Sequence, residues 1–158
     1  MGKEFKSLPL TEVRKKIYHY CAYQERCHQE VRDKLYTLGC SGNQVDEITS
    51  HLIEEGYLNE ERFAKAFAGG KFRLKNWGKI KIELALERKG LTKNCINAGL
   101  KQIDEIDYAR AIESLLNKKV VNLNEQNLFV KRDRLANYGI QKGFEPELVW
   151  RVVKEMIR

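Results

Sequence analysis

The chain has 158 residues, a net charge of +7 at pH 7, 42% apolar and 32% charged residues, and only two prolines. This composition excludes a disordered chain, and the sequence holds no apolar stretch of the length that crosses a membrane. The opening residues MGKEFKSLPL also lack the apolar segment of a secretory signal, so we expect a soluble, mostly helical protein located in the cytoplasm.

Residues 1–10 are polar and are expected to form an N-terminal tail. Residues 11–56 then predict three short helices, the first unit, because apolar side chains recur every three or four residues. Gly39 and Gly56 are suited to end the second and third helices, and Ser41 begins a capping box. The apolar positions are Val13, Ile17, Tyr20 and Cys21, then Val31, Leu35 and Leu38, then Val45, Ile48, Leu52 and Ile53.

Residues 57–104 predict a second unit, in which Asn59 caps the first helix and Thr92 caps the last. The middle helix is ambiguous, because apolar residues alternate with polar ones over residues 80–86, and alternation alone indicates a strand. Lys, Glu, Leu, Ala and Arg favour helices, and the repeat described below requires one, so we predict a helix.

Residues 105–158 predict a third unit. Its second helix is expected to begin at Asn124 as the cap, and its last helix has Pro146 in the first turn, where the missing N–H costs nothing. That last helix has the widest apolar stripe in the chain: Leu148, Val149, Val152, Val153, Met156 and Ile157.

An internal repeat relates the three units. Gly39, Gly90 and Gly143 are spaced by 51 and then 53 residues, and apolar residues stand six and thirteen positions after each of them. The middle copy departs from the pattern at Gly99, which indicates a weaker or more closely packed third helix. The sequence therefore predicts an all-α fold of three tandem three-helix repeats in an elongated arrangement that can curve.

Positive charge is concentrated in residues 71–93, the basic run. It has eight Lys or Arg against two acids, which is almost the whole net charge of the chain. Such a local concentration attracts phosphates or acidic side chains, although a solvated helix face that only maintains solubility is the alternative. The candidate contact residues are Lys71, Arg73, Lys75, Lys79, Lys81, Arg88 and Lys89, with Arg62 outside the run.

Three aromatic residues near the run have structural and functional interpretations. Trp77 could stack on a base or a guanidinium, but a tryptophan beside Gly78 at a helix start more often packs into a core, and we favour that role. Tyr57 and Phe63 flank a helix junction and are expected to pack as a pair that fixes the angle between units. Arg62 lies between them in sequence and is expected to point elsewhere.

Catalytic and metal-binding motifs are not found. The sequence has no phosphate-cradling glycine loop, no nucleophile elbow and no HExxH, so we predict a non-enzyme without a cofactor. His19, Cys21, Cys27 and His28 are the only residues grouped with metal-ligand chemistry, and their spacing does not match a zinc site. The four cysteines form no CxxC pair, which favours reduced thiols.

Three motifs stand out in the sequence. Residues 56–64 read GYLNEERFA, Trp77-Gly78 precedes the predicted middle helix, and Lys142-Gly143-Phe144 precedes the last helix. In these motifs the chain resembles the RecX family, the bacterial regulators of the recombinase RecA. The chain departs from the family at Gly139, where an apolar residue is more usual. The motif residues expected to be structural are Gly56, Tyr57, Phe63, Trp77, Gly78, Gly90, Gly143 and Phe144.

The resemblance implies a non-enzymatic protein that binds RecA filaments on single-stranded DNA, in the filament groove or at the growing end. It further implies inhibition of ATP hydrolysis, strand exchange and co-protease activity. The sequence leaves open a second hypothesis, a free-standing DNA-binding protein whose units act like helix-turn-helix modules on duplex or single strands. We expect a monomer with no membrane partner, because the apolar helix stripes can be buried between neighbouring units.

Overall fold

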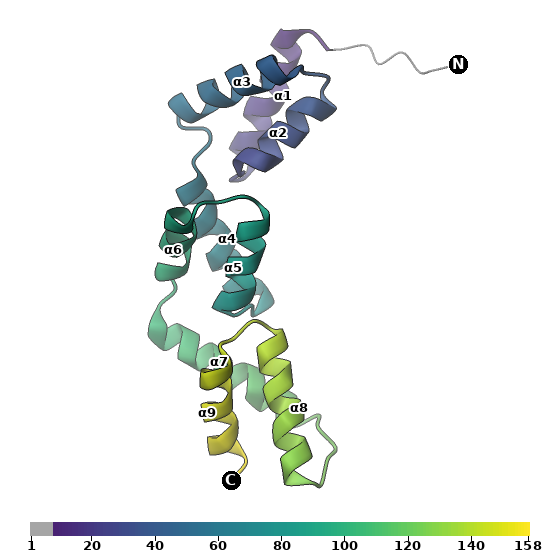
Figure 1. The fold of residues 1–158 in the computed structure, drawn as a ribbon, viewed down its shortest axis with the longest axis vertical. Helices are drawn as coiled ribbons and strands as arrows, with labels where there is room; N and C mark the ends of the chain where they lie inside the picture. The colour runs from purple at the N-terminus through teal and green to yellow at the C-terminus, as the bar shows by residue number, and fades with distance from the viewer. Residues whose placement is uncertain (1–7) are drawn as a thin grey trace, which may run out of the picture.

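The computed structural model describes residues 8–158, so most of the predicted N-terminal tail lies outside the described residues. Over this range the chain forms nine α-helices and no strand (Figure 1). None of these helices is long and apolar enough to cross a membrane. The helices are α1 (Leu10–Tyr23), α2 (His28–Thr37), α3 (Gly42–Glu54), α4 (Glu60–Lys75), α5 (Lys79–Arg88), α6 (Lys93–Lys101), α7 (Glu105–Val120), α8 (Leu128–Gln141) and α9 (Pro146–Met156).

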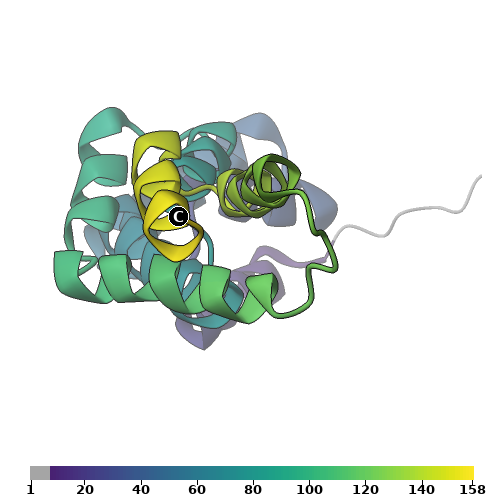
Figure 2. The same cartoon turned by 90° about the horizontal axis from the view of Figure 1, so that it is seen from below.

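The helices pack in three consecutive groups of three. The first, second and third units hold α1–α3, α4–α6 and α7–α9, and the closest helix contacts, such as that of α4 with α6, fall inside a unit. Figure 1 shows the units following one another along the long axis, and Figure 2 shows them overlapping when viewed along that axis. The predicted fold class is confirmed, and the division of the chain after residues 56 and 104 stays a prediction.

The three units are built on two hydrophobic cores. The first unit has its own core, formed by residues such as Ile17, Leu35 and Leu52, together with Leu58 from the connection that follows. One continuous core runs through the second and third units and joins α4–α6 to α7–α9. The second and third units therefore share one core, while the first unit has a core of its own.

The ambiguous segment after Gly78 is a helix, as predicted. Ile82 and Leu86, four residues apart, are fully buried, whereas Ile80 and Leu84 are 38% and 48% exposed. The apparent strand alternation arises because α5 has apolar residues on both its core face and its outer face.

Most of the predicted helix starts agree with the structure. The side chains of Ser41, Asn59 and Thr92 cap α3, α4 and α6 by accepting a hydrogen bond from a backbone N–H of the first turn. The prediction of Asn124 for α8 is wrong, because Asn127 accepts from the N–H groups of Phe129 and Val130 instead.

Two glycines allow helices to approach closely. A Cβ atom on Gly99 would lie 2.7 Å from the carbonyl oxygen of Ala64, so the departure of the middle repeat is explained by close packing of α6 on α4. A Cβ atom on Gly139 would lie 2.9 Å from Val149 Cγ1. The departure at Gly139 therefore makes room for α9 and does not leave a gap in the third unit.

Candidate polyanion interface

The basic run is anchored where the second unit meets the third. The turn between α4 and α5 lies against the turn between α8 and α9, where Gly78 N donates to Lys142 O (2.8 Å) and Ile80 N donates to Gly143 O (3.0 Å). Lys79 N donates to the hydroxyl of Tyr108 (3.0 Å). The first backbone N–H groups of α5, which have no partner inside the helix, are thus satisfied by the third unit.

Tyr108 is the buried polar centre of this joint, with 4% of its surface exposed. Its hydroxyl accepts from Lys79 N and donates to Glu145 Oε2 at 2.8 Å. Burial raises the pKa of Tyr108 far above its ordinary value, and the Glu145 carboxylate raises it further. The hydroxyl therefore stays protonated and ties α5 to α9.

Replacing Tyr108 by phenylalanine is expected to lower the free energy of unfolding by about 1–3 kcal/mol, because Lys79 N–H and Glu145 both lose a partner. Urea unfolding followed by circular dichroism measures the change. Tyr23→Phe is the matched control, since the Tyr23 side chain is exposed. Equal stability of the two variants would contradict the role given to Tyr108.

The glycines of the joint have no room for a side chain. Gly143 has a φ of +97°, which favours glycine, and a Cβ atom there would lie 2.2 Å from Lys81 Cβ. Gly56 and Gly90 also have positive φ values, at helix ends. Phe144 is fully buried beside Tyr108, with ring centroids 5.2 Å apart.

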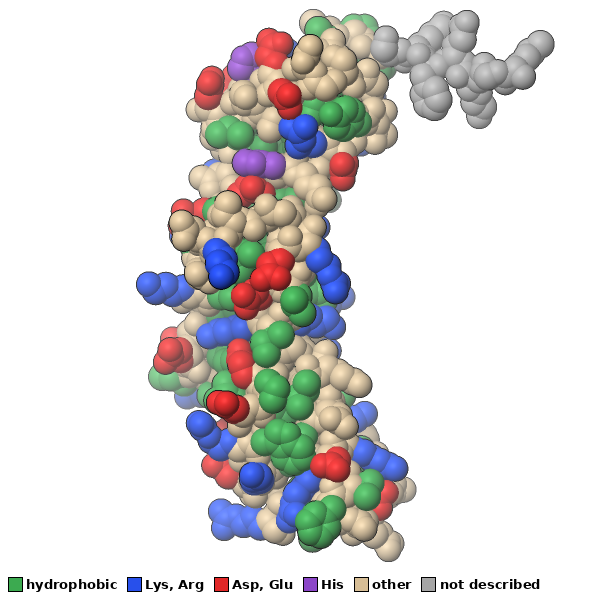
Figure 3. Space-filling view, in the orientation of Figure 1, with side chains coloured by type: hydrophobic (Ala, Val, Ile, Leu, Met, Phe, Trp, Pro, Cys, Tyr) green, Lys and Arg blue, Asp and Glu red, His purple; other side chains and the backbone are tan. Residues whose placement is uncertain are grey.

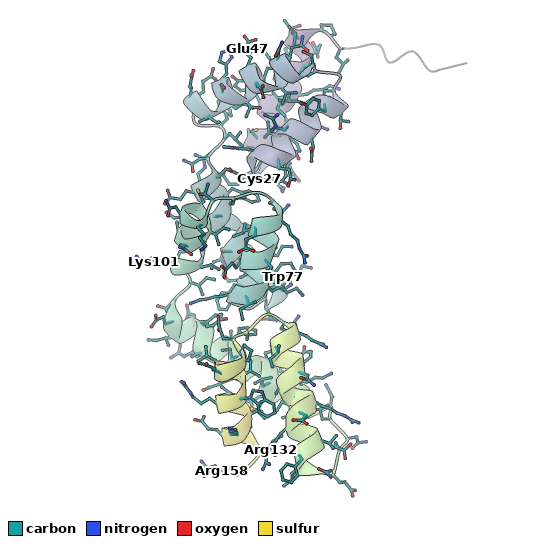
Figure 4. The ribbon with its side chains drawn as sticks, in the orientation of Figure 1. Cys27, Glu47, Trp77, Lys101, Arg132 and Arg158 are labelled. Atoms are coloured by element: carbon teal, nitrogen blue, oxygen red, sulfur yellow. The ribbon has the colours of Figure 1, made fainter. Side chains whose placement is uncertain are left out.

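Trp77 lies at the edge of the core of the second unit, on the side that faces the third (Figure 4). Its ring packs edge-on against Phe67, with centroids 6.4 Å apart. The ammonium groups of Lys71 and Lys81 lie 4.9 Å and 4.6 Å from the centre of the Trp77 ring. Trp77 thus packs as a partly buried core residue that also positions two cations of the run.

Aromatic rings also hold two further lysines of the run. Lys79 Nζ lies 4.6 Å from the centre of the Tyr108 ring, and Lys89 Nζ lies 5.8 Å from the centre of the Phe67 ring. Contacts of this type contribute about 0.5–1 kcal/mol at exposed sites. They restrict the lysine side chains without neutralising their charge.

The cations of the run have no acidic partner among the residues that the structure describes. Within residues 8–158, no carboxylate lies within 4.0 Å of the charged nitrogens of the seven candidate residues of the run. Lys79 and Lys81 also occupy the first turn of α5, which has no acid and where the helix dipole disfavours positive charge. Figure 3 shows Lys and Arg side chains along both edges of the middle of the molecule. This uncompensated charge favours an external anion as the partner.

The structure adds residues to the surface that the sequence could not assign. A hollow of about 290 Å³ lies between α5 and α8, with Lys81 and Arg88 among its lining residues. Lys142 joins the run, because its Nζ donates to Lys75 O at the end of α4 (3.2 Å). The lining residues of the hollow are Trp77, Lys81, Leu84, Ala85, Arg88, Ile140 and Gln141.

Arg62 is not part of this surface. Its Nε donates to Glu25 Oε1 (2.6 Å) and a terminal nitrogen donates to Gly56 O (2.9 Å), so the side chain links α4 to the first unit. The predicted pairing of Tyr57 with Phe63 is wrong. Tyr57 packs edge-on against Tyr18 of α1, with centroids 4.7 Å apart, whereas Phe63 is buried beside Phe67.

Replacing Arg62 by alanine is therefore expected to change the affinity for a polyanion by less than about twofold, while Arg88→Ala lowers it measurably. The loss of the partly exposed ion pair with Glu25 should cost at most about 1 kcal/mol of stability. Fluorescence anisotropy with a labelled oligonucleotide compares the two variants. A larger loss of affinity for Arg62→Ala than for Arg88→Ala would show that Arg62 is part of the interface.

The two cysteines of the group His19, Cys21, Cys27 and His28 lie in different cores, and neither histidine is buried. Cys21 is buried in the first unit, and Cys27, labelled in Figure 4, is buried in the core of the second at the junction between them. Burial raises the pKa of each of these thiols to about 11, so both stay protonated at neutral pH. Across residues 8–158, no three His, Cys, Asp or Glu side chains are arranged to hold a metal ion.

These observations define a class: an all-helical tandem-repeat protein with an uncompensated basic surface centred on its middle unit. A family model described as RecX, second three-helix domain, matches residues 59–100. Two solved RecX structures share the fold. The crystal structure of RecX from Lactobacillus salivarius has a TM-score of 0.82 at 21% identity and covers 93% of this chain and 96% of that one.

Similar full-length sequences carry the name regulatory protein RecX. The protein of Oceanobacillus iheyensis is 24% identical over 138 residues, which is 87% of this chain and 51% of the relative. That of Chlorobium limicola is 28% identical over 130 residues, which is 81% of this chain and 76% of the relative. One from Clostridium botulinum strain Alaska E43 is 30% identical over 132 residues, which is 82% of this chain and 61% of the relative. The middle unit thus matches a RecX domain, and most of the chain is similar to RecX proteins. The chain spans about half the length of the Oceanobacillus relative.

Proposed function

We propose that this protein regulates the recombinase RecA by binding RecA filaments on single-stranded DNA and inhibiting ATP hydrolysis, strand exchange and co-protease activity. The observation that carries the proposal is the set of cations on the middle unit that no carboxylate of the described chain compensates. A polyanion or an acidic protein face is the partner such a surface fits.

The shape of the molecule supports a filament as the target. The three units follow one another in a row (Figure 1), so a partner that is itself a helical polymer can contact several units at once. The second and third units share one core, and the first unit has its own. A rigid pair with a separately packed first unit can follow a groove or cover a filament end.

The alternative, a free-standing helix-turn-helix DNA-binding protein, is less well supported. In that mode the last helix of a unit enters the major groove and needs basic or polar residues to contact DNA. The helix α3 has three acids (Asp46, Glu47 and Glu54) and neither Lys nor Arg. The helix α9 carries as many acids as bases. The last helix of the second unit, α6, has Lys93 and Lys101 and no acid, but most cations of the run lie on α4 and α5.

The proposal is tested by measuring binding to bare single-stranded DNA and to RecA-coated DNA at the same salt concentration. We expect tighter binding to the coated strand, because in the proposed function the protein contacts RecA as well as the DNA phosphates. If the protein binds bare DNA tightly and leaves filament assembly untouched, the free-standing DNA-binding function is correct and the regulator function fails.

A further inference from the structure

A second cluster of cations and tyrosines lies in the first unit, outside the basic run. We call it the α1–α2 pocket, a hollow of about 430 Å³ between these two helices. Its lining residues are Lys16, His19, Tyr20 and Tyr23 from α1, Arg26 from the connection, and Lys34 and Leu38 from α2.

Helical spacing brings these side chains together. Lys16, Tyr20 and Tyr23 are four and three residues apart, so they lie on one face of α1. No carboxylate lines the hollow, and within residues 8–158 no acidic side chain lies within 4.0 Å of the charged nitrogens of Lys16, Arg26 or Lys34. The groove between α7 and α9 is different, because four glutamates line it. The lining of the α1–α2 pocket therefore includes lysine and arginine side chains and no carboxylate.

Arg26 is held in place inside the pocket. Its Nε donates to Tyr20 O (3.0 Å), and its guanidinium carbon lies 3.6 Å from the centre of the Tyr20 ring. The Nζ of Lys34 lies 5.6 Å from the same ring centre. A stacked guanidinium loses little further freedom when it binds an anion, so this side of the pocket is preorganised.

Tyr23 supplies an exposed aromatic surface at the same site. Its side chain is 75% exposed, and its ring lies 6.4 Å from that of His19 at an interplanar angle of 37°. The Tyr23 ring is thus available to a planar ligand beside the cations. Aromatic platforms next to a positive groove are the arrangement by which proteins hold single-stranded nucleic acid.

We propose that the α1–α2 pocket binds single-stranded nucleic acid, with a base stacked on Tyr23 and the flanking phosphates on Lys16 and Lys34. A duplex keeps its base faces inside the stack, so it cannot use Tyr23, and an acidic peptide would use the cations alone. The choice of single-stranded nucleic acid as the ligand rests on the proposed function. It places a second contact in the first unit, away from the basic run.

The test measures binding of the whole protein to a thymidine oligonucleotide without RecA, so it is independent of filament regulation. Tyr23→Ala is expected to weaken binding by about fivefold or more, since alanine removes a stacking contact. Tyr23→Phe keeps a stacking ring and should bind like the wild type. Tyr36→Ala is the control, because Tyr36 is an exposed tyrosine of the same unit that does not line the pocket.

Two further measurements separate stacking from charge. The double variant Lys16→Ala and Lys34→Ala should lower the slope of log affinity against log salt by about 1.4, which corresponds to two phosphate contacts on a single strand. Polyphosphate lacks bases, so the affinity of the protein for polyphosphate should not change in the Tyr23→Ala variant. Unchanged oligonucleotide binding by folded Tyr23→Ala would overturn the inference, as would polyglutamate binding that depends on Tyr23. If the variants change oligonucleotide binding as expected but the protein does not regulate RecA filaments, only the proposed function is overturned.

Discussion

Replacing Gly78 by alanine is expected to lower the free energy of unfolding by about 3 kcal/mol, the largest single effect at the joint. The added Cβ would lie 2.2 Å from the carbonyl carbon of Gly143 and from the backbone nitrogen of Phe144, so backbone must move. Movement there breaks the hydrogen bonds from Gly78 and Ile80 to the third unit. Urea unfolding measures the loss.

Gly70→Ala is the matched control. Gly70 lies inside α4, and no atom lies within 4 Å of the position its Cβ would take. Alanine is preferred over glycine in a helix by about 1 kcal/mol, so this variant should be equally or more stable than the wild type. Similar stability of Gly78→Ala and Gly70→Ala would contradict the described contact between the two turns.

The triple replacement of Lys75, Lys79 and Lys81 by alanine is expected to lower the affinity for single-stranded DNA on the order of tenfold. The slope of log affinity against log salt should fall by about 2, which is the value for three phosphate contacts. None of the three lysines makes an ion pair in the described chain, so helical content should be unchanged. Anisotropy titrations at several salt concentrations measure both quantities.

A second triple variant controls for net charge. Lys101, Lys118 and Lys154 are exposed, lie on α6, α7 and α9, and are outside the basic run. Their replacement by alanine removes the same three charges and should leave the affinity within about twofold of the wild type. Equal losses in the two triple variants would mean that only the overall charge attracts DNA, and the run would be a solvated surface.

The helices and their caps could be predicted from sequence because their determinants are local. Ser41, Asn59 and Thr92 each accept a hydrogen bond from the N–H three residues further on, so their role is visible in a short segment. Asn124 was predicted for α8 instead of Asn127 because both asparagines precede the same apolar pattern. The backbone conformation that selects one of them is not encoded in residue type.

The joints between units could not be predicted, because they depend on residues far apart in the chain. Tyr108 reaches Lys79 and Glu145, and Arg62 reaches Glu25, through the packing of whole units. Periodicity identified each apolar face and gave no information on which unit covers it. The sequence therefore allows neighbouring units to pack on one another but does not predict that the second and third units are the pair that shares a continuous core.

The candidate surface was predicted in part. The run itself is visible as a concentration of charge, while Lys142 and the hollow beside α8 belong to it only through the joint. The cation contacts of Trp77 were likewise missed, since Lys71 and Lys81 lie on different helices that meet at its ring. The α1–α2 pocket has too few cations in any one stretch of sequence to stand out.

In the function that we propose, the basic middle unit binds and restrains a RecA filament. The most direct measurement follows ATP hydrolysis by RecA on single-stranded DNA during titration with the wild type and with the Lys75, Lys79 and Lys81 triple variant. We predict that the wild type lowers the rate to a plateau and that the triple variant needs about ten times more protein to reach it. A rate that the wild type leaves unchanged, at concentrations where it binds the DNA, would contradict the claim.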